Sequence, residues 1–446
     1  MGAGISGLLA ARVLADHVDD VVVVERDGLP ETPRPRAGVP QGRHLHTLLP
    51  GGLEIACGYF AGLAEELEEA GAVRVRFGQD LAVYRPEGRS YLAPVYRPEP
   101  LVTGIDYFSM SRWLLEDVVR RRVRALPGVT VRGRSLVRGP LTSGDSVVGV
   151  VLDDGEVLDA DLVVDAAGRA GRSVAWLAHL GFEPPPESVI ECDVAYASAV
   201  LRPSAPEALT GAGVLVLPDP AGASPTRVGY LTPIEGGLWM AGLGGRFGDY
   251  PPAEVSGWRD FGRSLAWPGW DELVGTAELV GPPVPYRYPR SVRRHFERLE
   301  RFPDGLLPLG DAICHVNPLY GQGMSAAAAQ VRALDDVLDD RAHHRSGLDG
   351  LAREFFPLAF DATRTPWAVS AGADLVSPGT VGDYPDEELG GLLGLVQLGR
   401  LIDEDAEAAE LLADIFSLRR PLSVLDQPGW RERLAPVAPA SPVGVD

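Results

Sequence analysis

Three glycines within the first seven residues, Gly2, Gly4 and Gly7, constrain the fold of this chain more than any other feature. A helix-like run follows them, then the all-valine segment 21–24, which ends at Glu25. In a βαβ unit, the first glycine permits a tight turn, the second lets the backbone approach a pyrophosphate, and the third lets the helix pack closely on the sheet. An acid at the end of the next strand accepts hydrogen bonds from ribose hydroxyls. The pattern predicts an α/β domain that binds a dinucleotide.

The start of the chain departs from this pattern in one respect. The glycine turn of a βαβ unit follows a strand, whereas only Met1 precedes Gly2 here. We therefore expect the natural translation start to lie upstream and to add a strand of about five apolar residues.

Composition excludes several classes of function. The net charge of −21 argues against nucleic-acid binding, which needs a basic face. No apolar run approaches about 18 residues, so we expect no membrane span. The three cysteines form no close pair, which indicates neither a disulfide framework nor a thiolate metal site. We expect a cytoplasmic protein without a metal centre.

A second motif lies far downstream, in residues 309–312 (Leu-Gly-Asp-Ala) and 317–324 (Asn-Pro-Leu-Tyr-Gly-Gln-Gly-Met). All 41 basic residues of the chain are arginine and Asn317 is its single asparagine, as expected under coding pressure against A-rich codons. An asparagine retained under such pressure is an argument against a chance match.

In this motif the sequence resembles the FAD-dependent monooxygenases of the para-hydroxybenzoate hydroxylase fold. The resemblance implies that Asp311 binds the ribityl chain of FAD and that the turn 318–323 opens a helix whose N-terminus faces the flavin. A helix N-terminus stabilises the negative charge of reduced flavin. Residues 109–116 resemble the family's helix whose arginine, here Arg112, reaches the FAD phosphates. The predicted FAD-binding residues are Gly2, Gly4, Gly7, Glu25, Arg26, Arg36, Arg43, Arg112, Asp311, Pro318, Gly321, Gly323 and Met324.

Three segments resemble a narrower group, the actinobacterial flavin epoxidases of polyether biosynthesis: 36–46, 165–169 and 317–327. This resemblance implies that the enzyme inserts one oxygen atom through a flavin C4a-hydroperoxide and epoxidises an alkene in an apolar natural-product intermediate. Its expected partners are a small apolar organic substrate and molecular oxygen. An aromatic hydroxylase and a prenyl-chain reductase are the enzymatic alternatives, and a flavin-binding module without turnover is a further one.

Two departures from related families bear on the reaction. Aromatic hydroxylases carry Asp-Gly, then Ser and Arg, after the strand that here ends at Val164, whereas this chain has Asp-Ala-Ala-Gly-Arg at 165–169. Electrons are therefore expected from NAD(P)H either directly or through a separate flavin reductase. The Trp-x-Trp-x-Ile-Pro segment of halogenases and any lysine are absent, which disfavours halogenation.

Three histidines lie within the flavin motifs. His315 adjoins the flavin turn and is the candidate catalytic residue, as a general acid, with a structural role as the alternative. His44 and His46 are expected to be satisfied polar residues near the flavin or its phosphates rather than catalytic groups.

The predicted fold is α/β: a Rossmann-type FAD-binding domain with an inserted antiparallel substrate domain and a helical C-terminal region. Its parts are 1–185 (with an interposed strand region at about 76–100), 186–284, 285–345 and 346–446, the last with a frayed tail. Aromatic residues of the inserted domain suit an apolar substrate, and at least half of them are expected to be ordinary core residues. They are Tyr196, Trp239, Trp258, Trp267, Trp270 and Tyr286.

Overall fold

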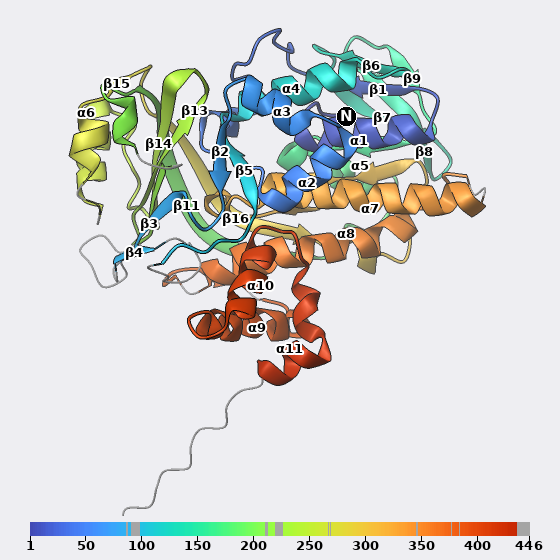
Figure 1. Ribbon diagram of the computed structural model, residues 1–446. Coiled ribbons are helices and arrows are strands. Elements are labelled where there is room, and N and C mark those ends of the chain that lie inside the picture. The colour runs from blue at the N-terminus through green and yellow to red at the C-terminus, as the bar shows by residue number, and fades with distance from the viewer. Residues whose placement is uncertain are drawn as a thin grey trace, which may run out of the picture.

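The structure is a computed structural model that describes residues 1–85, 88–90, 99–209, 213–218, 226–265, 267, 269–344, 347–375, 377–382 and 384–434. It confirms the α/β class. The lobe that contains the predicted dinucleotide-binding motif of residues 1–25, which we call the nucleotide-binding lobe, lies beside a lobe built on a large sheet, with helices beneath them (Figure 1). The helices are α1 (Ile5–His17), α2 (Pro50–Tyr59), α3 (Leu63–Glu69), α4 (Arg112–Arg124), α5 (Ser173–His179), α6 (Val255–Arg263), α7 (Gly323–His344), α8 (Leu351–Trp367), α9 (Leu389–Leu401), α10 (Ala406–Phe416) and α11 (Pro428–Arg433). The strands are β1 (Val21–Val24), β2 (Val73–Arg76), β3 (Leu81–Arg85), β4 (Gly88–Ser90), β5 (Asp106–Ser109), β6 (Val129–Arg132), β7 (Val137–Ser143), β8 (Ser146–Leu152), β9 (Val157–Asp159), β10 (Val163–Asp165), β11 (Glu187–Arg202), β12 (Gly213–Val216), β13 (Val228–Ile234), β14 (Leu238–Arg246), β15 (Glu278–Leu279), β16 (Val284–Arg294), β17 (Leu306–Pro308), β18 (Cys314–His315) and β19 (Val381–Gly382).

The nucleotide-binding lobe contains two pairs of parallel strands, β1 with β6 and β10 with β17. The first two residues of the chain lie between these pairs. The amino group of Met1 donates to the carbonyl of Val164 at 2.7 Å, and the amide of Gly2 donates to the carbonyl of Val24 at 2.8 Å. The start of the chain therefore connects β10 to β1 through backbone hydrogen bonds.

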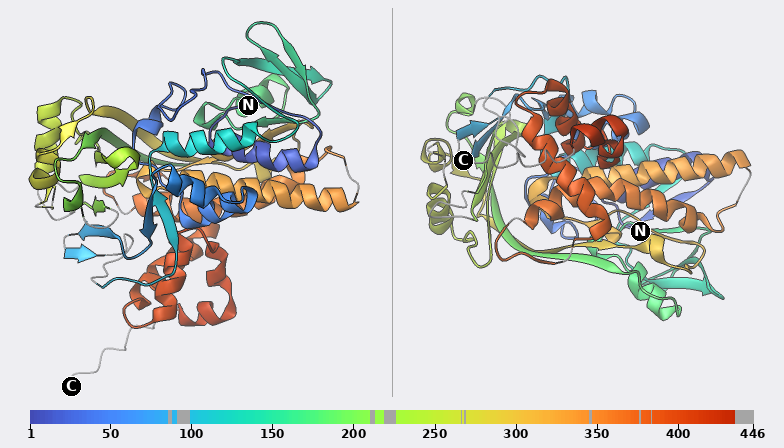
Figure 2. Two further views of the ribbon diagram at one scale, coloured as in Figure 1. Left: turned by 45° about the horizontal axis from the view of Figure 1, so that its top comes forward. Right: turned by 90° about the horizontal axis from the view of Figure 1, so that it is seen from below.

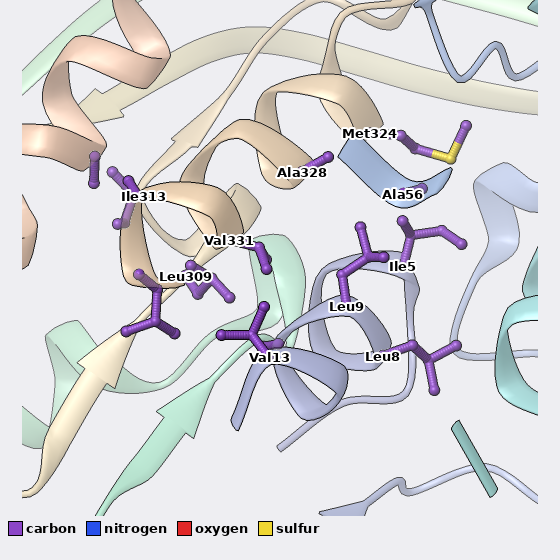
Figure 3. Close-up of a cluster of buried hydrophobic side chains, with 14 of the residues drawn as sticks. Ile5, Leu8, Leu9, Val13, Ala56, Leu309, Ile313, Met324, Ala328 and Val331 are labelled. Carbon is purple, nitrogen blue, oxygen red and sulfur yellow. The ribbon is translucent and has the colours of Figure 1, made fainter. Parts of the chain in front are cut away.

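Helix α1 packs against α7 and α2 in the core of this lobe (Figure 3). Leu8, Leu9 and Val13 of α1 are fully buried, and Val331 of α7 lies beside Leu9 and Val13 (Figure 3). Burial of such side chains stabilises a fold by about 1.5–3 kcal/mol each. The core therefore holds the N-terminus of α1 and that of α7 in fixed positions relative to each other.

The second lobe is a sheet of ten strands whose main order is β18-β16-β11-β14-β13-β12-β3-β4. Its central pairings are antiparallel, as predicted for the inserted domain, and β12 pairs with β3 in parallel. A turn at residues 235–237 joins β13 to β14. Strands β3 and β4 come from the predicted region 76–100, of which residues 86–87 and 91–98 lie outside the described residues. The long strand β11 and its neighbour β16 extend from one lobe to the other (Figure 2).

The chain after α7 is helical, as predicted. Helix α8 continues into a π-helical turn at Ala368–Gly372, and α9, α10 and α11 form a separate cluster below the two lobes (Figures 1 and 2). The sequence predicts a frayed tail after Pro428, but α11 covers Pro428–Arg433, and residues 435–446 lie outside the described residues. None of the described helices is both long enough and apolar enough to cross a membrane.

Candidate functional site

A cavity of about 690 Å³ lies between the two lobes, and the motifs identified in the sequence line it. The glycine turn, the end of β1, Arg112, the loop after β10, Asp311 and the turn 318–324 all line it. Of the fourteen residues predicted from the sequence, all but Gly7 and Arg43 are among the lining residues. Segments far apart in the sequence therefore contribute to one site.

The glycine turn is built for a close approach. Gly2 has φ +93°, and a Cβ there would lie 2.6 Å from the carbonyl oxygen of Ala166. A Cβ at Gly7 would lie 2.0 Å from the carbonyl oxygen of Gly2, which explains why the helix needs glycine although Gly7 does not line the cavity. Gly4 is the N-cap of α1 and makes no side-chain cap, so the first N–H groups of the helix are available to an anion.

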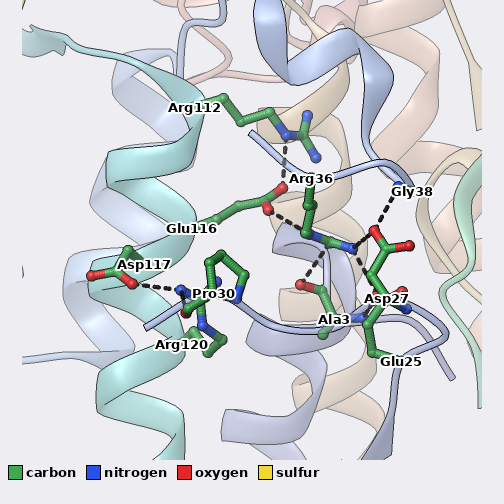
Figure 4. A network of polar contacts seen from close by, with 10 residues as sticks. All are labelled: Ala3, Glu25, Asp27, Pro30, Arg36, Gly38, Arg112, Glu116, Asp117 and Arg120. Atoms are coloured by element: carbon green, nitrogen blue, oxygen red, sulfur yellow. Dashed lines mark hydrogen bonds and ion pairs between the residues drawn. The ribbon is translucent and has the colours of Figure 1, made fainter. Parts of the chain in front are cut away.

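Glu25 and Arg36 form a buried network around this turn (Figure 4). One carboxylate oxygen of Glu25 accepts from the amide of Ala3 at 2.8 Å and pairs with Arg36 at 3.0 Å. Arg36 also donates to the carbonyl of Ala3 at 3.1 Å and pairs with Asp27 at 3.2 Å. Arg36 thus braces the turn and orients Glu25, a role that the sequence did not indicate.

Glu116 extends the network to the helix α4 (Figure 4). Its carboxylate accepts from Nε of Arg36 at 3.2 Å and from Nε of Arg112 at 2.8 Å. Arg112 therefore keeps its two Nη groups for other partners, and Nη2 lies 3.9 Å from the position of a Cβ on Gly4. Arg112 is aimed at the space in front of the glycine turn. Sequence reasoning missed Glu116, although its i, i+4 spacing from Arg112 was a usable signal.

Asp311 offers an unused acceptor in the cavity. Its carboxylate makes no hydrogen bond or ion pair with any residue that the structure describes, and burial raises its pKa, against the opposing charges of Arg112 and Arg169. The preceding Gly310 has φ +70° and donates its amide to Gln330 of α7 at 2.9 Å. This contact fixes the backbone that carries Asp311.

The turn 317–321 leads into α7. Oδ1 of Asn317 accepts from the amide of Leu319 at 3.1 Å, and Gly321 closes the turn with φ +68°. Helix α7 then begins at Gly323, which lines the cavity together with Pro318, Gly321 and Met324. The side chain of Asn317 is fully buried and points away from the cavity lining, so it shapes the turn.

We call the part of the cavity against the large sheet the tyrosine end, after Tyr196, Tyr286 and Tyr288. Burial raises the pKa of all three phenols, so they are neutral near pH 7. Four of the six aromatic residues named from the sequence, all tryptophans, pack in the core between the sheet and α6, in agreement with the expectation that at least half are core residues, and Tyr196 and Tyr286 line the cavity. The four tryptophans are Trp239, Trp258, Trp267 and Trp270.

His315 lies at the tyrosine end, where its Nδ1 and the hydroxyl of Tyr288 are 2.8 Å apart. Burial, helped by the charges of Arg169 and other arginines, lowers its pKa to about 3. A neutral imidazole is a poor general acid at pH 7, so the geometry favours the structural alternative for His315.

The remaining predicted residues, in the 36–46 segment and at Arg26, differ in whether they reach the cavity. His44 is buried, and its Nδ1 lies 2.8 Å from the hydroxyl of Ser198, whereas His46 lines the cavity. Arg43 ends a short 3₁₀ turn (Pro40–Arg43) that exposes its side chain, so it does not reach the cavity. Arg26 lines the cavity beside Glu25.

One described group outside the cavity has the spacing of metal ligands: His17, Asp335 and Asp339. Nε2 of His17 already pairs with Asp335 at 2.9 Å, and the group lies at the C-terminal end of α1. An ordinary hydrogen bond accounts for it.

The cavity lining fits FAD. The free Nη groups of Arg112 in front of the glycine turn suit a pyrophosphate, and the free carboxylate of Asp311 suits a chain of hydroxyl groups. The uncapped N-terminus of α1 adds N–H donors. A dinucleotide with a polyol chain would use all of these groups.

Comparison with known proteins agrees with this fit. The tryptophan halogenase family matches residues 90–214. Protein Rv3254 of Mycobacterium tuberculosis is 34% identical over 389 residues, which cover 84% of this chain and 79% of that protein. Among solved structures, the flavin-dependent brominase Bmp2 has a TM-score of 0.65 at 14% identity and covers 93% of this chain and 92% of its own. PqsL of Pseudomonas aeruginosa, described as a probable FAD-dependent monooxygenase, has a TM-score of 0.57 at 19% identity, over 83% of this chain and 94% of its own.

Proposed function

Since this chain belongs to the family of Protein Rv3254, within the superfamily of flavin-dependent monooxygenases and halogenases, we propose that it is an FAD-dependent monooxygenase that oxygenates an apolar substrate. One observation carries the proposal: the glycine turn, Arg112 and the free carboxylate of Asp311 line the same cavity as the tyrosine end. The cofactor and an organic substrate would thus meet in a single space.

Each part of the cavity has a place in binding the cofactor. The N-terminus of α1 and Arg112 would hold the pyrophosphate, Glu25 the ribose and Asp311 the ribityl chain. The turn 318–323 and the N-terminus of α7 would lie at the flavin ring. When bound and reduced, FAD supplies the reaction of molecular oxygen with an organic molecule, while the protein orients the substrate and keeps water away.

Epoxidation of an alkene is the reaction we propose. A phenol hydroxylase benefits from a base that ionises the ring, because phenolate is the better nucleophile. The tyrosine end offers His315, whose pKa is lowered to about 3, and phenols whose pKa values are raised by burial, so none of these described side chains is an effective base near pH 7. An alkene needs only to be held close to the reacting oxygen in a dry pocket. Aromatic hydroxylation is the alternative.

The route of the electrons and the disfavoured halogenation also follow from particular residues. Asp165 is fully occupied: one of its oxygens accepts from the amide of Arg172 at 2.7 Å and from the amide and hydroxyl of Ser173. This segment therefore has a structural role here, and we propose that a separate flavin reductase delivers electrons from NAD(P)H.

The chain contains no lysine, so a halogenase reaction that depends on one has no candidate residue.

The test is oxygen transfer with labelled oxygen gas. The FAD-loaded enzyme, a reductase system and NADPH are incubated with matched pairs of apolar alkenes and phenols, and products are examined by mass spectrometry. We expect one labelled oxygen atom in an epoxide. Label found only on aromatic rings would favour hydroxylation, and reduction of the alkene without label would favour a reductase. Omission of the reductase is the control, and rapid bleaching of the flavin by NADPH alone would contradict the proposed electron route.

A further inference from the structure

Arg169 brings a positive charge to the tyrosine end of the cavity. It lies in the loop after β10, where Gly168 turns the backbone with φ +69°. Its guanidinium carbon is 5.4 Å from the ring centre of Tyr286 and 5.2 Å from that of Tyr288, and it donates to the hydroxyl of Tyr286. Two aromatic rings and one neutral hydroxyl therefore hold the arginine at the cavity wall.

The other arginines of the cavity either have partners or lie at its glycine-turn end, where the free Nη groups of Arg112 face Gly4 and Arg26 lies beside Glu25. Arg36 and Arg112 are paired with carboxylates, and Arg172 donates to two backbone carbonyls, those of Val137 and Arg138. Arg169, by contrast, forms no ion pair with any carboxylate in the described part of the chain. Cation–π contacts leave the charge of the guanidinium in place. Arg169 is thus able to receive an anion.

The groups around Arg169 would not compete for that anion. Tyr196 stacks beside Tyr286 with ring centres 5.3 Å apart, and all the phenols and the imidazole of His315 are neutral near pH 7. Asp311 is the acid of this region, and the proposed binding of FAD assigns its carboxylate to the ribityl chain. A ligand with a negative end would find one cation and a wall of aromatic rings.

We propose that Arg169 binds a carboxylate of the substrate, whose apolar, unsaturated part lies against the tyrosines. A guanidinium binds a carboxylate through two parallel hydrogen bonds, which fixes orientation as well as position. The substrate class is then an apolar alkene acid. This inference rests on the proposed function, because it takes the tyrosine end as the place of the substrate. A delocalised oxyanion could also come from reduced flavin, and the experiment separates the two sources.

The test measures binding at equilibrium in the oxidised, FAD-loaded enzyme, so that it does not depend on turnover. The probes are trans-cinnamate and its neutral amide, trans-cinnamamide, which have nearly the same shape. The variants are R169Q and, as a matched control, R172Q, which alters a neighbouring arginine of the same loop that bonds to carbonyls. Isothermal titration gives the affinities, and a redox titration gives the flavin potential of each variant.

We expect the wild-type enzyme to prefer cinnamate to cinnamamide at least tenfold. R169Q should remove this preference and leave cinnamamide within about twofold, because the variant lacks the charge that receives the carboxylate, and R172Q should retain the preference. No preference in the wild-type enzyme, including no binding of either probe, would overturn the proposal. So would a shift of the flavin potential in R169Q without a change in cinnamate affinity, because the anion would then be the flavin. Failure of oxygen transfer with these affinities intact would instead contradict the proposed function alone.

Discussion

The side-chain amide of Asn317 donates to both carboxylate oxygens of Asp374, at 2.9 and 3.1 Å. Asp374 is completely buried and also accepts from the hydroxyl of Tyr320 at 2.9 Å and from Arg246 at 2.7 Å. One carboxylate of the helical C-terminal region thus meets two side chains of the flavin turn and the last residue of β14. The turn is held by a residue that lies more than fifty positions away in the sequence.

Substitution of Asn317 tests whether this contact positions the turn. Asn317→Ala removes the amide but leaves the pair between Asp374 and Arg246, and we expect tenfold or greater weakening of FAD binding with a modest loss of stability of about 1–3 kcal/mol. Asp374→Asn leaves Arg246 buried without its partner, and we expect about 3–5 kcal/mol of destabilisation. Fluorescence titration of the apoprotein with FAD and thermal unfolding measure the two effects. Wild-type FAD affinity in Asn317→Ala would contradict the positioning role.

Asp311 should contribute to FAD binding without contributing to the fold. Because its carboxylate has no partner among the described residues, its removal breaks no contact within the protein. We expect Asp311→Ala to unfold at or above the wild-type temperature and to bind FAD about tenfold to hundredfold more weakly, the loss of charge-assisted hydrogen bonds of roughly 1.5–3 kcal/mol. Asp311→Asn keeps the shape and one acceptor and should fall between the two. Full flavin content in purified Asp311→Ala would show the assignment to be wrong.

The candidate cofactor site could be assembled from the sequence because its chemistry lies in short local motifs. A glycine turn, a strand-end acid and the turn 317–324 need only neighbouring residues to be recognised, and the structure brings them to one cavity. The groups that orient these motifs were missed, since Glu116 and Asp374 gain their roles from tertiary packing that leaves no local pattern. For the six aromatic residues, the sequence predicted correctly that at least half belong to the core, but it could not say which ones. Aromatic residues on a sheet can face either the substrate or the core, and packing under α6 placed four of them in the core.

Stability should fall as the pH is lowered toward 5, because His44 and His315 are buried as neutral imidazoles. Burial is the main cause of the pKa shifts: it lowers the pKa of His44 to about 4 and that of His315 to about 3, from an ordinary value near 6.5. The unfolded chain therefore takes up protons below pH 6.5 that the folded chain does not. The protein has its full stability above pH 6.5. Below that pH, each of the two histidines lowers the free energy of unfolding by up to about 1.4 kcal/mol per pH unit. Thermal unfolding of the wild type and of His315→Gln at pH 7.5 and pH 5 measures this. An equal pH dependence in both proteins would contradict the contribution of His315.

Gly7 and Gly58 form a matched pair that tests the glycine turn itself. Both lie in helices, α1 and α2, but a Cβ at Gly7 would lie 2.0 Å from the carbonyl oxygen of Gly2, whereas a Cβ at Gly58 would have no neighbour within 4 Å. Gly7→Ala must push the helix away from the turn, so we expect it to lose FAD and to destabilise the nucleotide-binding lobe by at least about 1–3 kcal/mol, as overpacking does. Gly58→Ala should bind FAD normally and gain up to about 1 kcal/mol of stability from helix propensity.

The Gly2 carbonyl belongs to the backbone that joins β10 to β1, so the strain in Gly7→Ala cannot relax through a side-chain rotation. FAD titration and thermal unfolding of the two variants would decide the matter, and a Gly7→Ala protein that matches Gly58→Ala in both would show that the close approach of α1 to the turn is not required.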